Sequence, residues 1–148
     1  MKLSENFSLN ELTKSQTATR QGISNQPSGE HLDNLKALVE NVLQRIRDSR
    51  GQPIRVTSGY RSAELNAAIG GSSKSQHSKG EAADFEITGV VNYELAQWIR
   101  DHIPEFDQLI LEFYNSGDKN SGWIHCSYSQ EKNRKQVLTA TKENGKTV

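Results

Sequence analysis

Hydrophobic residues recur at helical spacing from Glu30 to about Arg50, the longest such pattern in the chain. Polar residues fill the positions between them, as in a helix that buries one face. The segment makes about five turns at 3.6 residues per turn, and Gly51 follows it as a helix stop. The pattern predicts one long helix, whose apolar face consists of Leu32, Leu35, Leu38, Val39, Val42, Leu43 and Ile46.

Shorter segments alternate between apolar and polar residues, which is the pattern of a strand with one buried face. Most of them lie in the second half of the chain, and residues typical of turns separate them. The predicted strands are Pro53–Thr57, Ala82–Ile87, Gln108–Phe113 and Trp123–Tyr128, with Val137 and Leu138 as a candidate for a last strand.

Short helices are predicted from their end signals. Ser8 and Glu11 have the spacing of a capping box for a first helix through Leu12. Ser62 can cap another short helix, which Gly70 closes. Each of these helices is brief, so its ends define it better than its apolar pattern does.

Asn92 can cap a further helix that runs to about His102. The polar segment Ser15–Gly29 is predicted to be an ordered connection, and Ser72–Gly80 a loop. Helices are thus concentrated early and strands late.

This order predicts a small α+β domain, a mainly antiparallel sheet with helices packed on it. We expect a single domain over residues 1–148, with its core at about 7–128 and a polar C-terminal tail from about 130. A chain of 148 residues is long enough to bury such a core.

The amino-acid composition limits the kinds of molecule that the chain is expected to bind. The 18 basic residues balance the 18 acidic ones, which argues against an electrostatic nucleic-acid binder or a polybasic membrane binder. The single cysteine, Cys126, excludes an internal disulfide. We therefore expect a monomer with no nucleic-acid or membrane partner.

The most informative polar stretch is Ser75–Asp84. His77 lies in its predicted loop, Gly80 permits a tight bend, and Asp84 enters the next strand. A loop that folds back on a strand can bring an imidazole and a carboxylate to one metal ion. His125, in a later strand, can supply the third ligand that a catalytic zinc site needs.

The same residues also allow a structure without metal. A histidine in a strand is commonly packed or on the surface, and an aspartate at a strand end can simply be polar. The chain has four histidines, so two ligand candidates can arise by chance. The other two, His31 and His102, lie on predicted helices and are expected to face solvent. Spacing alone leaves a zinc site and a metal-free domain both open.

Three motifs occur in a fixed order along the chain: Ser58–Ser62, Ser75–Asp84 and Trp123–Ser127. Together they resemble one family of zinc peptidases, the D-alanyl-D-alanine carboxypeptidases and endolysins. The resemblance runs from about Phe7 to Tyr128, and two further blocks, Asn6–Leu12 and Phe106–Glu112, are similar to the phage and prophage branch. The family shares its metal fold with D-alanyl-D-alanine dipeptidases and the hedgehog signalling domain.

The resemblance implies a role for each matching residue. It makes His77, Asp84 and His125 the ligands of one zinc ion per chain. Arg61 would contact the substrate and stabilise negative charge on the scissile carbonyl, although a surface ion pair is its plainer interpretation. Further substrate contacts are implied for two residues, Ser75 and Gln108, whereas packing is expected for Tyr60.

The general base is the point where this chain departs from the family pattern. Many members carry an acidic residue three positions before the last histidine, where this chain has Gly122. Glu112 is the nearest replacement, because a hairpin could turn it to the same side as His125. An ordinary strand residue is the alternative for Glu112, and the weaker candidates for the base are Glu81 and Glu86. Cys126 should point away from the site and be buried.

We therefore expect a zinc peptidase that cuts an amide bond in peptidoglycan peptides, as a carboxypeptidase or an endopeptidase. The alternatives are a non-catalytic zinc-containing module that binds cell wall or forms part of a virion, and a metal-free structural domain. No apolar stretch of a secretory signal is seen, nor the roughly 20 apolar residues of a membrane span. We expect synthesis in the cytoplasm and action on the cell wall after release through a separate permeabilising partner.

Overall fold

The computed structural model describes residues 1–141 of the chain. Its helices are α1 (Leu9–Thr13), α2 (Gln16–Gln21), α3 (Glu30–Leu38), α4 (Gln44–Arg50), α5 (Ala63–Ala68) and α6 (Asn92–His102), with a π-helical turn η1 (Val39–Leu43) and a 3-10 turn η2 (Gln76–Lys79). Its strands are β1 (Arg55–Ser58), β2 (Ala82–Glu86), β3 (Gln108–Tyr114), β4 (Trp123–Ser127) and β5 (Gln136–Thr141).

The strands form one sheet in the order β1-β2-β4-β3-β5. Neighbours pair antiparallel except β3 and β5, which are parallel. The parallel pair has a simple cause. β4 runs back to the level where β3 begins, and the chain then hydrogen-bonds from Lys135 to Phe106 and from Gln136 to Asp107. It thus enters the free edge of β3 at its start and runs along it in the same direction.

The predicted α+β fold with a mainly antiparallel sheet is confirmed, and so is the candidate last strand around Val137 and Leu138. That strand lies within the segment expected to be a polar tail, whose residues 142–148 lie outside the described part of the chain.

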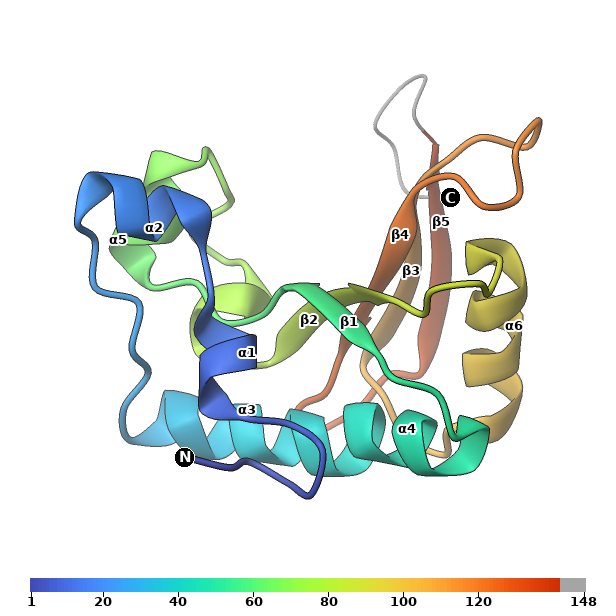
Figure 1. Cartoon of the computed structure of the whole chain (residues 1–148), viewed down its shortest axis with the longest axis horizontal. Coiled ribbons are helices and arrows are strands. Elements are labelled where there is room, and N and C mark those ends of the chain that lie inside the picture. The colour runs from blue at the N-terminus through green and yellow to red at the C-terminus, as the bar shows by residue number, and fades with distance from the viewer. Residues whose placement is uncertain (142–148) are drawn as a thin grey trace.

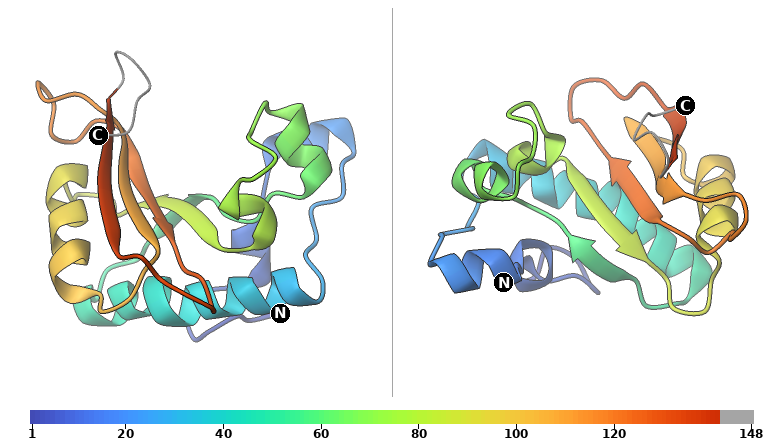
Figure 2. Two further views of the ribbon diagram at one scale, coloured as in Figure 1. Left: turned by 180° about the vertical axis from the view of Figure 1, so that it is seen from behind. Right: turned by 90° about the horizontal axis from the view of Figure 1, so that it is seen from above.

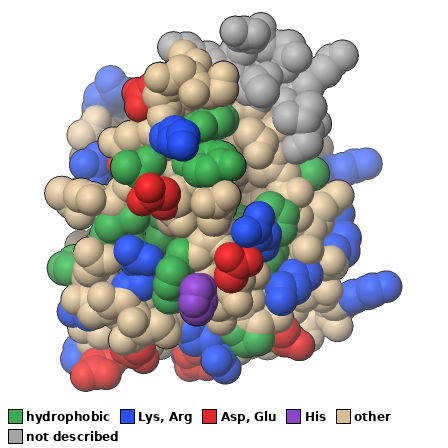
Figure 3. Space-filling view, turned by 90° about the vertical axis from the view of Figure 1, so that its right-hand side faces the viewer, with side chains coloured by type: hydrophobic (Ala, Val, Ile, Leu, Met, Phe, Trp, Pro, Cys, Tyr) green, Lys and Arg blue, Asp and Glu red, His purple; other side chains and the backbone are tan. Residues whose placement is uncertain are grey.

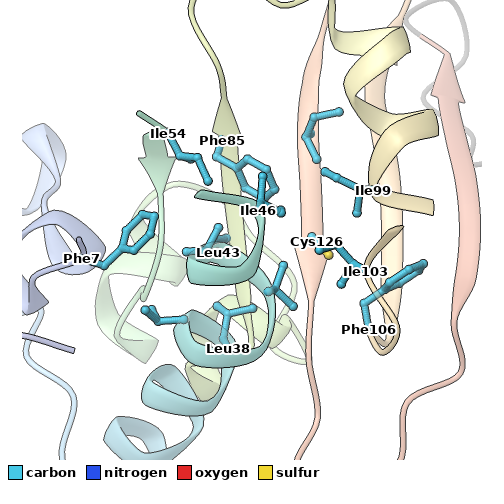
Figure 4. Packing of buried hydrophobic residues seen from close by; sticks show 14 of the residues in the cluster. Phe7, Leu38, Leu43, Ile46, Ile54, Phe85, Ile99, Ile103, Phe106 and Cys126 are labelled. Atoms are coloured by element: carbon cyan, nitrogen blue, oxygen red, sulfur yellow. The ribbon is translucent and has the colours of Figure 1, made fainter. Parts of the chain in front are cut away.

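Helices cover one face of the sheet. α3, η1 and α4 form a continuous rod beneath β1 and β2, and α6 stands beside β3 (Figures 1 and 2). The core lies between these helices and the covered face (Figure 4). A fully buried leucine, isoleucine or phenylalanine contributes roughly 1.5–3 kcal/mol. The labelled members are Phe7, Leu38, Leu43, Ile46, Ile54, Phe85, Ile99, Ile103, Phe106 and Cys126.

The predicted helix ends are largely confirmed. Ser8 and Glu11 form the complete capping box of α1, and Ser62 accepts a hydrogen bond from the backbone of Leu65 at the start of α5. The long helix begins at Glu30 and ends before Gly51, which has a left-handed backbone. Its π-helical middle, η1, was not predicted. A π-helical turn bonds one residue further along the chain than an α-helical turn, and the apolar pattern is the same before and after it.

Three local expectations were wrong. Ser15–Gly29 contains helix α2, capped by Ser15 and closed by Gly22. The predicted loop before β2 contains the turn η2. Asn92 is the first residue of α6 and not its cap, which is Val91. The Asn92 side chain is buried and donates to Glu86 and to backbone oxygens of the β3–β4 loop, so tertiary contacts outweigh its capping preference.

The side of the molecule that carries α6 exposes hydrophobic side chains among charged ones (Figure 3). A cavity of about 140 Å³ lies there between α6, β3 and β5, with Leu109, Leu111 and Val137 in its wall. Within residues 1–141, no helix has the length and apolar character needed to cross a bilayer.

Candidate metal centre

Strand pairing brings two of the three predicted ligands together. Asp84 of β2 lies directly opposite His125 of β4. Directly paired residues of antiparallel strands point to the same side, here the face that α3 and α4 leave open. Their alternating neighbours Phe85, Ile124 and Cys126 point the other way and are fully buried in the core. The prediction of a buried Cys126 is confirmed, and burial raises the pKa of its thiol.

The third predicted ligand, His77, comes from η2. Ser75 begins this turn and its hydroxyl accepts a hydrogen bond from the His77 backbone at 3.2 Å. Gly80 ends it with a φ of 77°, where a side chain would overlap the carbonyl oxygen of His31 in α3. The turn is also held by the Asn34 amide, which donates to the Lys79 carbonyl. The glycine therefore serves both a left-handed backbone and a close approach to the long helix.

The His77 ring is fixed by a backbone group. Its Nδ1 lies 2.7 Å from the carbonyl oxygen of Gly59 and must carry the proton to donate there. Its Nε2 is then free as an acceptor and lies 3.4 Å from Oδ1 of Asp84. His125 presents Nδ1 to the same oxygen at 2.9 Å.

The three side chains meet at one point. One ligand atom from each of His77, Asp84 and His125 lies within 4.8 Å of the others. Two imidazole nitrogens and one carboxylate oxygen form the donor set of a catalytic zinc site with a position left open. The Gly59 carbonyl supplies the outer hydrogen bond that commonly orients a ligating histidine. The residues present therefore fit a zinc ion.

Asp84 is held in its charged form. Burial by itself would raise its pKa, but the hydrogen bond from His125 and the close contact with His77 outweigh burial and lower the pKa well below its usual range. An ionised carboxylate beside two neutral imidazoles is the state in which these groups bind a divalent cation.

Sequence comparison agrees with this geometry. The chain matches the family described as peptidase M15 over residues 5–127, which includes all three candidate ligands. The chain belongs to the peptidase M15 family. Over 61 residues it is 41% identical to the zinc D-Ala-D-Ala carboxypeptidase of Streptomyces albus G. That stretch is 40% of this chain and 24% of the carboxypeptidase, so the match covers about a quarter of the relative's length.

Arg61 of this M15 chain lies beside the metal centre. Its backbone nitrogen donates to the His77 carbonyl at 3.1 Å. Its side chain is half-buried, and its Nε is buried without a hydrogen-bond partner within the described residues. Burial lowers the pKa of Arg61, whereas the nearby Asp84 carboxylate raises it. No ion pair of Arg61 is found in residues 1–141, so a bound anion could use its donors.

Glu112 lies on the same face of the sheet as the ligands. In the register of β3 with β4, Ile110 faces His125 and Glu112 faces Trp123, so the alternation places Glu112 on the side of His125. Burial raises the pKa of Glu112 above its ordinary value, and the nearby Asp84 carboxylate acts in the same direction. A half-buried carboxyl on the same face as the candidate ligands has the chemistry and the position of a proton-transfer group.

Gly122 occupies a position that admits no side chain. Its φ is 71°, and a Cβ there would overlap the carbonyl oxygen of Glu112. The β3–β4 hairpin is irregular at this point, since Phe113 also has a positive φ, of 52°. The ring of Phe113 stacks on Trp123 with centroids 5.1 Å apart. The acidic residue missing from position 122 is therefore sterically excluded from this hairpin.

The remaining predicted site residues have local partners. Ser75 uses its hydroxyl to cap η2, and the Gln108 amide donates to Gln136 across β3 and β5 at 2.8 Å. Their substrate contacts stay predictions. Glu86 shares the open face with Asp84 and accepts from Asn92, while burial raises the pKa of Glu81.

Two residues that position the site carried little sequence signal. Gly59 orients His77 and contacts Leu12 so closely that a side chain would overlap its carbonyl. Its place in the motif Ser58–Ser62 was its signal in the sequence. Buried Asn25 donates to Tyr60 and accepts from Ser62, and nothing in its sequence context marks it.

Of the remaining predictions for tyrosine and histidine residues, two are confirmed and one is wrong. Tyr60 is buried, as expected, and its hydroxyl lies 3.4 Å from His31. His31 is consequently half-buried, which corrects its predicted exposure. His102 is exposed as predicted and stacks on Trp98.

Proposed function

We propose that this M15 peptidase is a zinc enzyme that hydrolyses an amide bond in peptidoglycan peptides, with one zinc ion per chain. The convergence of His77, Asp84 and His125 on the open face of the sheet carries the proposal. The name of the Streptomyces relative, a zinc D-Ala-D-Ala carboxypeptidase, supports both the metal and the substrate class.

The three ligands would hold the ion through two neutral imidazoles and one carboxylate. Zinc held there supplies a Lewis acid and lowers the pKa of a coordinated water. The protein keeps the ligand set rigid, because Asp84 and His125 lie on paired strands and His77 is held by Gly59. Rigid ligands avoid reorganisation during the reaction.

Arg61 is proposed to bind the substrate and to stabilise charge on the scissile carbonyl. Its permanent charge, its unpartnered Nε and its proximity to Asp84 support this role. A surface ion pair, the plainer interpretation, is not formed within the described residues. Ser75 and Gln108 are proposed as secondary contacts with the peptide.

Glu112 is proposed as the general base. From the open face it would take a proton from the attacking water and deliver it to the leaving amine. Its half-buried position and raised pKa support the assignment over that of an ordinary strand residue.

A carboxypeptidase and an endopeptidase would place the same carbonyl against these residues. Mass spectrometry of the fragments released from purified peptidoglycan would identify the bond that is cut. Loss of a terminal D-alanine alone would assign a carboxypeptidase, and cleavage within the stem peptide would assign an endopeptidase.

The His77→Ala variant tests the proposal directly. We expect it to lose zinc and the release of peptidoglycan fragments together, because the substitution removes one of three ligands. His102→Ala is the matched control, since this histidine is exposed on α6 and should retain both properties. Full activity of His77→Ala would contradict the proposal.

The Glu112→Gln variant separates an enzyme from a non-catalytic binding module. An enzyme should keep zinc and lose at least about 100-fold in kcat, the contribution typical of a general base. A binding module should show the same binding of cell wall before and after the change. Glu105→Gln, an exposed residue before β3, is the control.

The proposed place of action is the cell wall, reached with the help of a separate permeabilising partner. Expression of the chain by itself in a bacterial cytoplasm should then leave the cell wall uncut and the cells intact, and co-expression with a membrane-permeabilising protein should lead to cleavage of the wall peptides. Lysis by the chain alone, measured as a fall in culture turbidity, would contradict this route.

A further inference from the structure

We infer that a cationic groove along the outer edge of β1 binds an internal carboxylate of the peptide substrate, about two residues from the bond that is cut. The inference rests on the proposed function and adds to it a second anchoring site, carried by Lys14 and Arg55.

The groove has a volume of about 580 Å³. It is bounded by the start of α2, by all four residues of β1 and by α5. Helices α2 and α5 lie together at one end of the molecule, and β1 runs from there through its middle (Figure 1). β1 is an edge strand, and no further backbone partner for it is found within residues 1–141. Its outer backbone groups are thus available to a ligand.

The charge of the groove is one-sided. Its lining includes Lys14, Arg55 and Arg61 and contains no carboxylate, although the whole chain is neutral. The cavity of about 680 Å³ beside α3 and η2 is the opposite, since four acidic residues line it, Glu30, Asp33, Glu81 and Glu131. Cations gathered without counterions in a concave site favour an anionic ligand.

The basic side chains of the groove have no partner among the described residues. The ion pairs found there involve Arg100, Arg134 and histidines, and none of the groove residues. Glu86 lies opposite Arg55 across β1 and β2, but it accepts a hydrogen bond from Asn92 and forms no ion pair within 4.0 Å. Lys14 and Arg55 are both exposed at the groove, so a carboxylate can reach them.

The groove leads directly to the metal centre. Ser58 of β1 lies opposite the ligand Asp84, and the Thr57 hydroxyl donates to the Asp84 carbonyl at 3.2 Å. Arg55 lies opposite Glu86, two residues further along β2, which is about 7 Å of strand. An extended peptide covers that length with about two residues. With its scissile carbonyl at the zinc and Arg61, a substrate would bring a carboxylate two residues away to Arg55 and Lys14.

The opposite wall of the groove is apolar. It is lined by Leu65 of α5 and by Ile69, the C-cap residue that follows this helix, and Ile69 is 44% exposed. A cationic wall facing an apolar one fits a peptide that combines small methyl side chains with a free carboxylate. A purely apolar or a cationic peptide would leave Lys14 and Arg55 unpaired.

The experiment compares two soluble pentapeptides that end in D-Ala-D-Ala. One carries a free glutamate carboxylate two residues before the terminal D-Ala-D-Ala bond, and in the other that carboxylate is amidated. Each is titrated into the zinc-loaded chain of residues 1–148, while NMR follows the backbone amides of residues 14–17 and 55–58 and the peptide resonances. The protein signals report binding, and the peptide signals report cleavage in the same sample.

We expect the free acid to shift those amides and to bind about three- to tenfold more tightly than the amide, with the difference reduced at high salt. Lys14→Gln/Arg55→Gln should abolish the difference. Lys36→Gln/Arg45→Gln, on the helical rod beneath the sheet, makes the same change in charge and should preserve it.

Equal affinity for the two peptides, or equal behaviour of the two double variants, would overturn the inference even if cleavage is observed. A preference for the free acid without any cleavage would support the groove and count against the proposed hydrolysis. The two ideas therefore fail in distinguishable ways.

Discussion

At the scale of single residues, the chain departs from its family pattern at Gly122, where many members carry an acidic residue. The sequence predicted that Gly122 cannot act as a base and that Glu112 could replace the usual residue. The close approach of Gly122 to the Glu112 carbonyl gives the physical reason, because the same contact excludes any side chain at position 122. Such steric exclusion depends on backbone geometry and could not be predicted from residue types.

Gly122→Ala should destabilise the protein by at least about 2 kcal/mol, because the new Cβ combines a strained positive φ with overlap of a backbone oxygen. Urea unfolding followed by circular dichroism would measure the loss. Gly117→Ala in the same β3–β4 loop is the control, since a Cβ there makes only an ordinary contact with Asn115. Equal stability of the two variants would refute the steric account.

At the scale of elements, periodic patterns and end signals predicted most helices and strands, and what they missed has two causes. Helix α2 is too short for a periodic pattern. The buried role of Asn92 depends on the distant β3–β4 loop, and the parallel edge strand β5 depends on where β4 ends. These features are fixed by contacts between elements, which local sequence does not encode.

Asp107 is one such contact. Its carboxylate is buried at the start of β3 and accepts from Gln76 in η2 and from Arg134 before β5. Asp107→Asn should therefore cost about 2 kcal/mol of unfolding free energy at pH 7, the scale of a hydrogen bond to a charged group. Asp101→Asn, whose pair with Arg100 is exposed, should leave stability nearly unchanged.

The pH dependence of this loss has a definite sign. The hydrogen bonds from Arg134 lower the pKa of Asp107 in the folded protein. Its contribution is then fully present above the unfolded value of about 3.9 and disappears as pH falls through the folded pKa. The difference between wild type and Asp107→Asn should shrink below about pH 4 in unfolding curves recorded from pH 7 to pH 3. A difference that grows toward low pH would contradict this account.

At the scale of the whole molecule, the candidate metal centre brings together side chains that are distant along the sequence. Spacing along the chain left zinc and a metal-free domain both open. The ordered motifs favoured zinc, but only strand register and the Gly59 contact bring the three side chains to one point. Motifs could thus predict which residues meet, whereas the distances between them required the folded sheet.

Zinc should consequently stabilise the entire domain. At a free zinc concentration 100-fold above Kd, linkage adds about 2.7 kcal/mol, or roughly 5–10 °C in Tm for a chain of this size. Differential scanning calorimetry with and without a chelator would measure the shift. His77→Ala should show none, and a shift of equal size in that variant would place the ion elsewhere.

The direct pairing of Asp84 with His125 has a further consequence for how correctly folded protein can be recognised. A slip of β4 by one residue against β2 would bring Ile124 or Cys126 opposite Asp84 and turn the imidazole toward the interior. Such a misaligned chain could still be compact, yet it would have lost a ligand. The amount of zinc bound per molecule would then measure the fraction of a preparation whose strands are in the native register. Molecular size and helix content would not distinguish the two registers.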